Sequence, residues 1–160
     1  MIVLRVMGAA DVATIQNWPA YPPEFVDLDY ALRSNGWLDE HRHKPDTWLY
    51  VAEQTGEIIA FTILSKTSAT EAEFRIALRA DKIGQGLGST LTTMTLDKGF
   101  AEIKLARIHL IVRTNNPRAI RLYKSLGFAE NGDCLKKVNG KQANFLAMIL
   151  SKETYTTISG

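Results

Sequence analysis

The first half of the chain alternates short apolar runs with polar turns. The apolar segment Ile2 to Val6 predicts a strand, and apolar positions recur at helical spacing from Asp11 to Trp18, which predicts a helix. A proline-rich aromatic loop follows, and residues 25–34 restart a helical pattern that ends at Asn35-Gly36. Short polar turns then separate three predicted antiparallel strands, at residues 47–53, 57–64 and 71–79.

The second half changes to a helical period before it returns to strands. Leu87, Leu91 and Met94 recur at steps of four and three, which predicts a helix running to about Phe100. Residues 108–112 form a near-continuous apolar run, which is typical of a strand covered on both faces.

The last part of the chain predicts one more helix and two strands. Asn116-Pro117 favours the start of the helix, and Leu126-Gly127 favours its end. Residues 128–138 and 144–150 predict strands around Asn139-Gly140, a dipeptide typical of tight hairpin turns. The element order therefore predicts an α+β fold built around one mixed sheet.

Length and composition narrow the class of protein. The 160 residues fit a single domain, which we expect at residues 1–150, followed by a frayed polar tail at residues 151–160. Hydrophobic residues make up 46% of the chain, which is enough for a core. A net charge of +2 is too mild to favour a nucleic-acid partner, so we expect none.

The sequence also bears on location. Cys134 is the only cysteine, which suits a reducing compartment. No apolar stretch approaches the ~20 residues that cross a bilayer, and the N-terminal segment lacks the features of a secretion signal. We therefore expect a cytoplasmic protein without a membrane partner.

A glycine-rich segment lies between a predicted strand and a predicted helix, where main-chain N–H groups and the positive helix end can cradle a phosphate. It is not a Walker A loop, because no lysine follows its last glycine. A dinucleotide fingerprint would need a further glycine where serine stands. Taken alone, the segment is explained equally well by a tight turn that starts a helix. Its residues are Ile83, Gly84, Gln85, Gly86, Leu87, Gly88, Ser89 and Thr90.

A second segment places Asn116 and Tyr123 about two helical turns apart, so both side chains project from one face of the predicted helix. On that face they could contact one extended ligand. The alternative is structural: Asn116 caps the helix, and Tyr123 is a half-buried aromatic residue with a satisfied hydroxyl.

Together the two segments resemble motifs A and B of the GNAT superfamily of acetyl-CoA-dependent N-acetyltransferases. Gly86 and Gly88 match the two small positions of motif A, whereas Ile83 stands at its Gln/Arg position. The element order resembles that family over most of the chain, and the branch that it resembles includes ribosomal-protein and spermidine N-acetyltransferases. Motif B is the more specific match and has no gap; its residues here are Asn116, Ala119, Tyr123, Gly127 and Phe128.

The resemblance implies a mixed, mostly antiparallel central sheet of about seven strands with helices on both faces. It also implies acetyl-CoA as the cosubstrate and transfer of the acetyl group to a primary amine of a small molecule, peptide or protein. No metal is expected. The residues that the resemblance assigns to acetyl-CoA are Ile76, Ala77, Leu78, the loop residues 83–90, Asn116, Ala119 and Tyr123.

Attack on a thioester needs a neutral amine, yet a primary amine with a pKa of about 10.4 holds its proton at pH 7. Glu71 and Glu73 project from one face of the strand before the glycine loop, and either could take that proton directly or through water. We choose Glu73, since many relatives of this branch carry a glutamate there; a solvated strand carboxylate is the alternative. The resemblance further implies an oxyanion-stabilising N–H near Ala77 or Leu78, and Tyr123 as the acid for the leaving thiolate.

Other reactive side chains are weaker candidates. Cys134 would supply an acyl-enzyme route, but no base lies beside it in the sequence, and a small buried or edge residue explains it better. His41 and His43 have no third ligand at a metal-binding spacing, so we expect a polar loop there. His109 lies within an apolar strand and is expected to be a satisfied core histidine.

The segment between the first two strands is where the resemblance puts the acceptor, and its aromatic and acidic residues suit an ammonium group. The alternative is that the aromatics are core and the acids lie on a solvated helix face. A non-catalytic acyl-CoA-binding or regulatory module on the same fold is the second functional hypothesis, and pairing of the last strands across a homodimer is a further one. The residues of this segment are Trp18, Tyr21, Glu24, Asp27 and Asp29.

Overall fold

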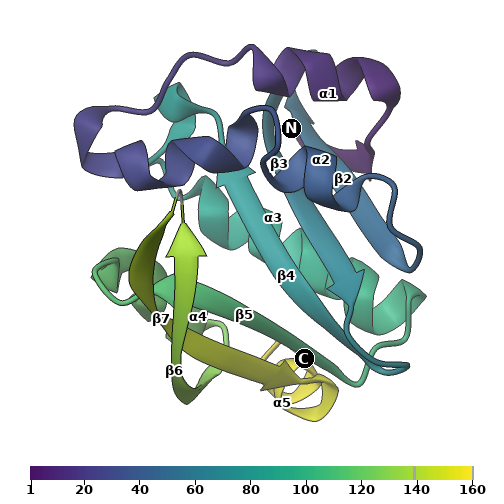
Figure 1. The fold of residues 1–160 in the computed structure, drawn as a ribbon. Coiled ribbons are helices and arrows are strands. Elements are labelled where there is room, and N and C mark those ends of the chain that lie inside the picture. Colours follow the sequence, from purple (N-terminus) through teal and green to yellow (C-terminus); the bar gives the residue numbers. More distant parts are fainter. Residues whose placement is uncertain (139, 160) are drawn as a thin grey trace. The chain divides into compact units, whose positions relative to one another are not determined.

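The structure is a computed structural model that describes residues 1–138 and 140–159, with only the main chain of Ser159 (Figure 1). Asn139, the first residue of the expected hairpin dipeptide, lies outside the described residues. The chain divides into two compact units. Unit 1 consists of Met1–Ser65 and Arg75–Thr95, and unit 2 consists of Lys66–Phe74 and the chain from Leu96 onward. The expectation of a single domain stays a prediction.

The strands form a seven-stranded sheet in the order β1-β2-β3-β4-β5-β7-β6. The β1–β2, β2–β3, β5–β7 and β6–β7 pairs are antiparallel, and β4–β5 is parallel. The expected α+β fold with a mixed, mostly antiparallel sheet is therefore confirmed. The strands are β1 (Ile2–Val6), β2 (Thr47–Gln54), β3 (Glu57–Lys66), β4 (Glu71–Leu78), β5 (Arg107–Arg113), β6 (Ala129–Val138) and β7 (Lys141–Ser151).

The helices differ more from expectation than the strands do. The helix expected at residues 25–34 is a 3-10 helix, interrupted at Phe25 with φ −120° and ψ 15°, and the short helix α2 was not expected. Within the described residues, no helix is long and apolar enough to cross a membrane. The α-helices are α1 (Ala9–Gln16), α2 (Trp37–His41), α3 (Leu87–Asp97), α4 (Pro117–Ser125) and α5 (Lys152–Ser159); η1 (Pro23–Leu32) and η2 (Ala80–Lys82) are 3-10 helices, and η3 (Lys98–Glu102) is a π-helix.

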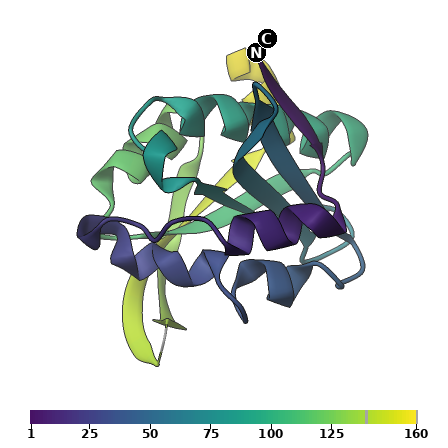
Figure 2. The same ribbon diagram turned by 90° about the horizontal axis from the view of Figure 1, so that it is seen from above.

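Unit 1 has helices on both faces of its part of the sheet, as expected (Figure 2). On one face, Ile15 of α1, Leu32 of η1 and Leu38 of α2 are fully buried in one cluster with Phe61 of β3. On the other face, Leu91 of α3 is fully buried in a second cluster with residues of β2 and β3. The apolar spacing of each helix thus matches the sheet face that it covers.

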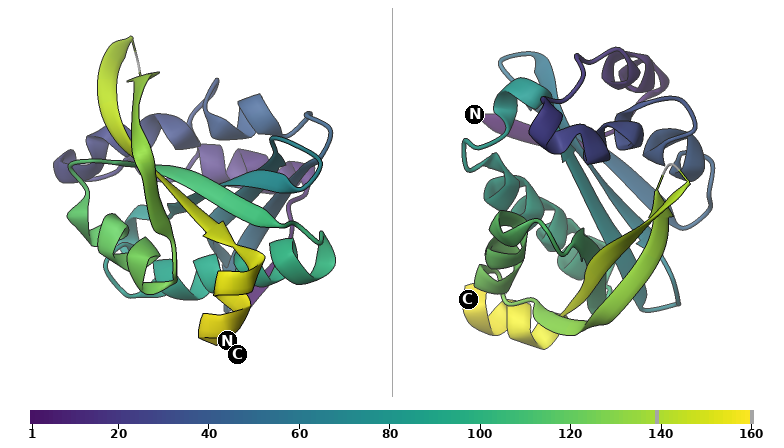
Figure 3. Two further views of the ribbon diagram at one scale, coloured as in Figure 1. Left: turned by 90° about the horizontal axis from the view of Figure 1, so that it is seen from below. Right: turned by 60° about the vertical axis from the view of Figure 1, so that its left-hand side comes forward.

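Unit 2 contains the parallel pairing of β4 with β5 and the antiparallel β5, β7 and β6 (Figure 3). On β5, Ile108, Leu110 and Val112 are buried, and the residues between them are half-buried. The expectation of a strand fully covered on both faces is therefore wrong for one face. The alternation shows that only every second side chain of the apolar run enters the core.

The end of the chain forms a helix rather than the expected frayed tail. Tyr155 of α5 is buried, its hydroxyl donates to the carboxylate of Asp97, and its ring centroid lies 5.2 Å from that of Phe100. A Cβ at Gly127, where φ is 104°, would lie only 2.6 Å from the Ile158 side chain, so α5 packs closely on the end of α4. The expectation for residues 151–160 is wrong over Lys152–Ser159, because one buried aromatic residue anchors an otherwise polar segment.

Candidate active site

The glycine loop lies in unit 1 between β4 and α3. Gly84 and Gly86 have φ values of 84° and 78°, in the left-handed region that strains residues with a Cβ. A Cβ at Gly86 would meet nothing within 4 Å, so the main chain there faces open space. The helix begins at Leu87, and the first N–H groups of a helix have no partner within it. The loop therefore offers main-chain donors and a positive helix end, which fit a pyrophosphate group.

The end of β4, also in unit 1, is held from two directions. The buried Tyr21 donates its hydroxyl to the main-chain oxygen of Leu78 at 2.5 Å. Burial raises the pKa of the Tyr21 hydroxyl well above its ordinary value, so the group keeps the proton that it donates. The next residue along the strand, Arg79, donates its N–H to the Ile59 oxygen at 2.8 Å. Two main-chain groups that adjoin the expected oxyanion donor, the Leu78 carbonyl and the Arg79 N–H, are therefore held by hydrogen bonds.

Helix α4 in unit 2 begins where its motif predicts. The Asn116 side-chain oxygen accepts a 3.2 Å hydrogen bond from the Ala119 N–H, so the structural alternative for Asn116, a helix cap, is confirmed. The Tyr123 side chain is 8% exposed, and its ring meets Phe128 edge-on with centroids 5.6 Å apart. Burial raises the pKa of the Tyr123 hydroxyl above its ordinary value, so it holds its proton at neutral pH.

Two carboxylates project from β4 in unit 2. An oxygen of Glu71 lies 3.6 Å from a guanidinium nitrogen of Arg107, so this carboxylate belongs to an ion pair. Glu73 is half-buried and lies opposite His109 of β5 in the parallel register. His109 Nε2 is 2.9 Å from the Thr67 hydroxyl, so this histidine is satisfied, but it is half-buried rather than a core residue.

The predicted site residues divide between the two units. In unit 1, the side chains of Ile76 and Leu78 pack against the α3-side cluster, and Ala77 belongs to the cluster under α1 and η1. The loop is accessible, since Gly84, Gln85 and Gly86 are exposed. Unit 1 holds Ile76, Ala77, Leu78 and residues 83–90, and unit 2 holds Glu73, Asn116, Ala119 and Tyr123.

The rival reactive residues have other surroundings. Cys134 is half-buried on β6. His41 is buried in α2 at 4% exposure, so the expectation of a polar loop is wrong for it. His43 follows the helix, and its Nε2 accepts from Arg42 Nε at 3.1 Å. Among the residues that the structure describes, no three His, Cys, Asp or Glu side chains are grouped so that they could hold a metal ion.

The segment expected to bind the acceptor is largely structural. Trp18 and Tyr21 are buried, which confirms the alternative that these aromatics are core. Asp29 receives two hydrogen bonds from Arg33 at 2.8 and 2.9 Å and one from the Tyr21 N–H at 3.2 Å, and the guanidinium lowers the pKa of its carboxyl. The exposed acids of the segment are Glu24 and Asp27.

Sequence reasoning missed an arginine on β4. The Cζ atom of Arg75 lies 5.1 Å from the centre of the Trp37 ring. Trp37 in turn meets Tyr30 and Phe61 edge-on, with ring centroids 6.2 and 6.4 Å apart. The signal was present in the sequence, because Arg75 follows Glu73 by two residues and strand alternation puts both side chains on one face.

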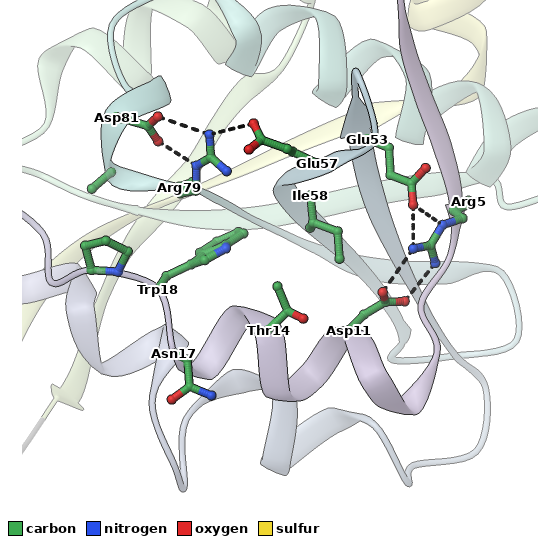
Figure 4. A pocket seen from close by; sticks show the side chains of 13 residues that line it. Arg5, Asp11, Thr14, Asn17, Trp18, Glu53, Glu57, Ile58, Arg79 and Asp81 are labelled. Carbon is green, nitrogen blue, oxygen red and sulfur yellow. Dashed lines mark hydrogen bonds and ion pairs between the residues drawn. The ribbon is translucent and has the colours of Figure 1, made fainter.

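A cavity of about 860 Å³ lies elsewhere in unit 1, and none of the predicted acetyl-CoA or catalytic residues lines it. Two arginine-centred ion-pair clusters stand on its wall, with Ile58 and Trp18 between them (Figure 4). Every carboxylate that lines the cavity is paired with an arginine, so the clusters tie the segments around it together. The clusters are Arg5 with Asp11 and Glu53, and Arg79 with Asp81 and Glu57.

Comparison with known proteins identifies the family. The model of the acetyltransferase (GNAT) family matches residues 12–128 of the chain. The chain belongs to this family. The predicted resemblance is therefore confirmed, and the chain is an acyltransferase of the GNAT family.

Relatives of this GNAT chain include the predicted branch. The spermidine N(1)-acetyltransferase of Escherichia coli (strain K12) is 29% identical over 150 residues, which cover 91% of this chain and 77% of that protein. The [ribosomal protein bS18]-alanine N-acetyltransferase of the same strain is 38% identical over 77 residues, 48% of this chain and 51% of that protein. A crystal structure of mutant forms of the spermidine/spermine N-acetyltransferase SpeG from Vibrio cholerae matches with a TM-score of 0.78 at 26% identity and covers all of both chains. The likeness extends over the full GNAT fold.

Proposed function

We propose that this chain transfers the acetyl group of acetyl-CoA to the primary amine of a small molecule by direct attack, without an acyl-enzyme. The observation that carries the proposal is the glycine loop, where Gly84 and Gly86 adopt left-handed φ values immediately before α3. The family match and the relatives named as acetyltransferases of amines support the same reaction.

Main-chain groups do most of the cosubstrate binding in this proposal. Ile83 provides no polar side chain for the pyrophosphate, so the N–H groups of residues 84–90 and the positive end of α3 carry that contact. The main chain of Ile76 to Leu78 binds the part of acetyl-CoA beyond the pyrophosphate. Asn116 and Ala119 at the start of α4 supply further contacts to acetyl-CoA. The open space at Gly86 lets the ligand approach the main chain closely.

Glu73 is the proposed base. It takes a proton from the ammonium form of the acceptor, directly or through water, because only the neutral amine has the electron pair for attack. The amine nitrogen then bonds to the thioester carbon, the nitrogen loses its second proton to water, and the carbon–sulfur bond breaks to leave a neutral amide. The main-chain N–H of Ala77 or Leu78 stabilises the charge that develops on the carbonyl oxygen, an effect strengthened by its fixed position.

Tyr123 is the proposed acid for the leaving thiolate. Its raised pKa keeps the proton on the hydroxyl until sulfur departs. A tyrosine that is hard to ionise is a weak acid, so it gives up its proton only as negative charge develops on the departing sulfur. The tyrosine regains its proton from solvent after each turnover.

The rival hypothesis is an acyl-CoA-binding or regulatory module without turnover. The first test is release of CoA thiol from acetyl-CoA with a panel of primary amines. The second is thermal unfolding with acetyl-CoA or CoA, and with NAD as the comparison for a dinucleotide site. We expect amine-dependent thiol release and a higher unfolding midpoint with either CoA species. A ligand at 100 times its Kd adds about 2.7 kcal/mol, or roughly 5 °C or more at this size. A midpoint shift without thiol release would support the binding module, and no shift would remove both hypotheses.

The proposal includes a cytoplasmic location and a homodimer. Support for the dimer is the exposure of β6, the strand at the end of the sheet order, where Leu135 is 63% exposed. An edge strand with free main-chain groups can pair with a second copy. The mass of the protein in solution, measured by light scattering, tests this: a monomer at micromolar concentration contradicts the dimer.

A further inference from the structure

Arg75 and Glu73 lie two residues apart on β4, and strand alternation directs both side chains to one face. Their Cα atoms are therefore about 7 Å apart along the strand. Ala77, the next residue of the same parity, belongs to the buried cluster under α1 and η1, whereas Ile76 and Leu78 pack on the opposite face. The face that carries the proposed base thus also carries a permanent positive charge.

Arg75 is held there by an aromatic cluster. Its Cζ lies 5.1 Å from the Trp37 ring centre, and Trp37 is itself set between Tyr30 and Phe61 by edge-on contacts. The chain before Trp37 is equally constrained, because a Cβ at Gly36 would lie 2.1 Å from the Tyr30 main-chain oxygen. The position of the guanidinium is therefore built by the fold of unit 1.

The Arg75 guanidinium lies over the Trp37 ring. Arginine has five N–H donors, so a guanidinium over a ring can still bind an anion beside its other contacts. The fork of donors matches the two oxygens of a carboxylate. The same charge repels a second ammonium group on the acceptor.

From this arrangement we infer that Arg75 selects the acceptor, and that the acceptor class is a primary amine that carries a carboxylate, in preference to a diamine or polyamine. The inference rests on the proposed function and assigns its substrate class. The amine is placed at Glu73, and the carboxylate at Arg75. Of the acids that would favour a polycation, Asp29 is bound by Arg33. Arg75 is a specificity residue in this account and takes no part in proton transfer.

The test uses three acceptors with the same four-carbon length: 4-aminobutyrate, butylamine and 1,4-diaminobutane. They differ at the far end, which is a carboxylate, a methyl group or an ammonium. We expect kcat/KM of the wild type to be about tenfold or more higher for 4-aminobutyrate than for the diamine, with butylamine between them. Spermidine is added as a fourth probe and is expected to rank with the diamine.

Variants separate selection from chemistry. Arg75→Gln should bring the three values within about threefold of one another by raising KM for 4-aminobutyrate more than KM for butylamine. Arg75→Lys keeps the charge and loses the fork, so it should retain part of the preference. Arg107→Gln, which removes an arginine paired with Glu71, is the control and should leave the ranking unchanged. Thermal unfolding of each variant checks that it is folded.

The outcomes distinguish failure of the inferred acceptor class from failure of the proposed acetyl transfer. Acetylation of butylamine with a wild-type preference for the diamine or spermidine overturns the inference and leaves the proposed function standing. The same follows if Arg75→Gln keeps the wild-type ranking. If none of the amines is acetylated, the proposed function fails, and the inference fails with it.

Discussion

The Tyr21 hydroxyl donates a 2.5 Å hydrogen bond to the Leu78 main-chain oxygen, which joins the loop after α1 to the end of β4. We expect Tyr21→Phe to cost about 1 kcal/mol of unfolding free energy, since a buried carbonyl loses its donor. If Leu78 must be held for oxyanion stabilisation, kcat should also fall, by roughly tenfold. Urea denaturation and steady-state kinetics measure the two effects. Loss of stability without loss of kcat would limit Tyr21 to a structural role.

Tyr123→Phe tests the acid directly. The change removes one oxygen from a buried ring that still packs on Phe128, so the fold and acetyl-CoA affinity should persist. Turnover should fall about 10²- to 10⁴-fold. Calorimetric titration with acetyl-CoA and a stopped assay give the two quantities. An unchanged kcat would remove Tyr123 from the mechanism.

The raised pKa of Tyr123 makes a further prediction about pH. The hydroxyl should keep its proton beyond about pH 10, so ionisation of this residue should cause no fall in kcat at or below that pH. The rate should instead rise with pH as the amine loses its proton. The pH profile of the wild type measures this, with Tyr123→Phe as the reference. A fall in kcat between about pH 8 and pH 9 that is absent from the variant would contradict it.

Glu73→Gln should slow acetyl transfer at pH 7 by about 10²-fold or more. The defect should shrink as the pH approaches the amine pKa of about 10.4, where the acceptor loses its proton without a base. The matched control is Glu71→Gln, since Glu71 lies two residues away on the same face and its ion pair with Arg107 is known. Rate measurements from pH 6 to about pH 10 compare the two. Equal defects in both variants, or a larger one in Glu71→Gln, would reassign the base.

Gly86→Ala tests the glycine loop with a close control. Gly86 and Gly56 have φ values of 78° and 82°, and a Cβ at either would meet nothing within 4 Å. Both substitutions should therefore cost about 1–2 kcal/mol of stability through backbone strain alone. Only Gly86→Ala should also weaken acetyl-CoA binding, because its methyl group enters the space where the ligand approaches. Equal acetyl-CoA affinity in the two variants would argue against the cradle.

Asp11 gives a prediction about acid stability. Arg5 binds its carboxylate at 2.7 and 3.0 Å and lowers its pKa in the folded chain. Asp11 therefore takes up its proton at a higher pH in the unfolded chain than in the folded chain. The stability that its pairing with Arg5 contributes is present above about pH 4 and is lost as the pH falls through the pKa of Asp11 in the folded chain. Asp11→Asn should lower the free energy of unfolding at pH 7 by about 1–3 kcal/mol, towards the lower end because Arg5 is 39% exposed. The variant should also lose less stability than the wild type as the pH falls below about 4. An equal loss of stability in acid for the variant and the wild type, measured by chemical denaturation, would contradict it.

The periodicity of the sequence predicted the strands and α4 well, because local patterning and capping residues determine them. β3 was expected at residues 57–64 and runs over Glu57–Lys66, and α4 begins after Asn116 as expected. α2 and α5 were missed for a physical reason. Both are short, and each depends on a tertiary contact: Trp37 against Phe61, and Tyr155 against Phe100.

The candidate site was predicted only where its motifs are local. The glycine loop and the Asn116 cap follow from neighbouring residues. The Tyr21–Leu78 hydrogen bond joins residues 57 positions apart, and the Arg75–Trp37 contact likewise depends on the fold. Patterning within a short window carries no signal for such distant pairs, although it does place Arg75 on the same strand face as Glu73.

The most direct test of the central claim is the mass of the products after incubation of the wild-type protein with acetyl-CoA and a primary amine. The account predicts an N-acetylated amine in equal amount to the CoA thiol released, and no acetyl group on the protein. Acetyl-CoA that binds but stays intact with every amine would contradict the claim. An acetyl group on Cys134 that forms and decays at the rate of turnover would contradict direct attack.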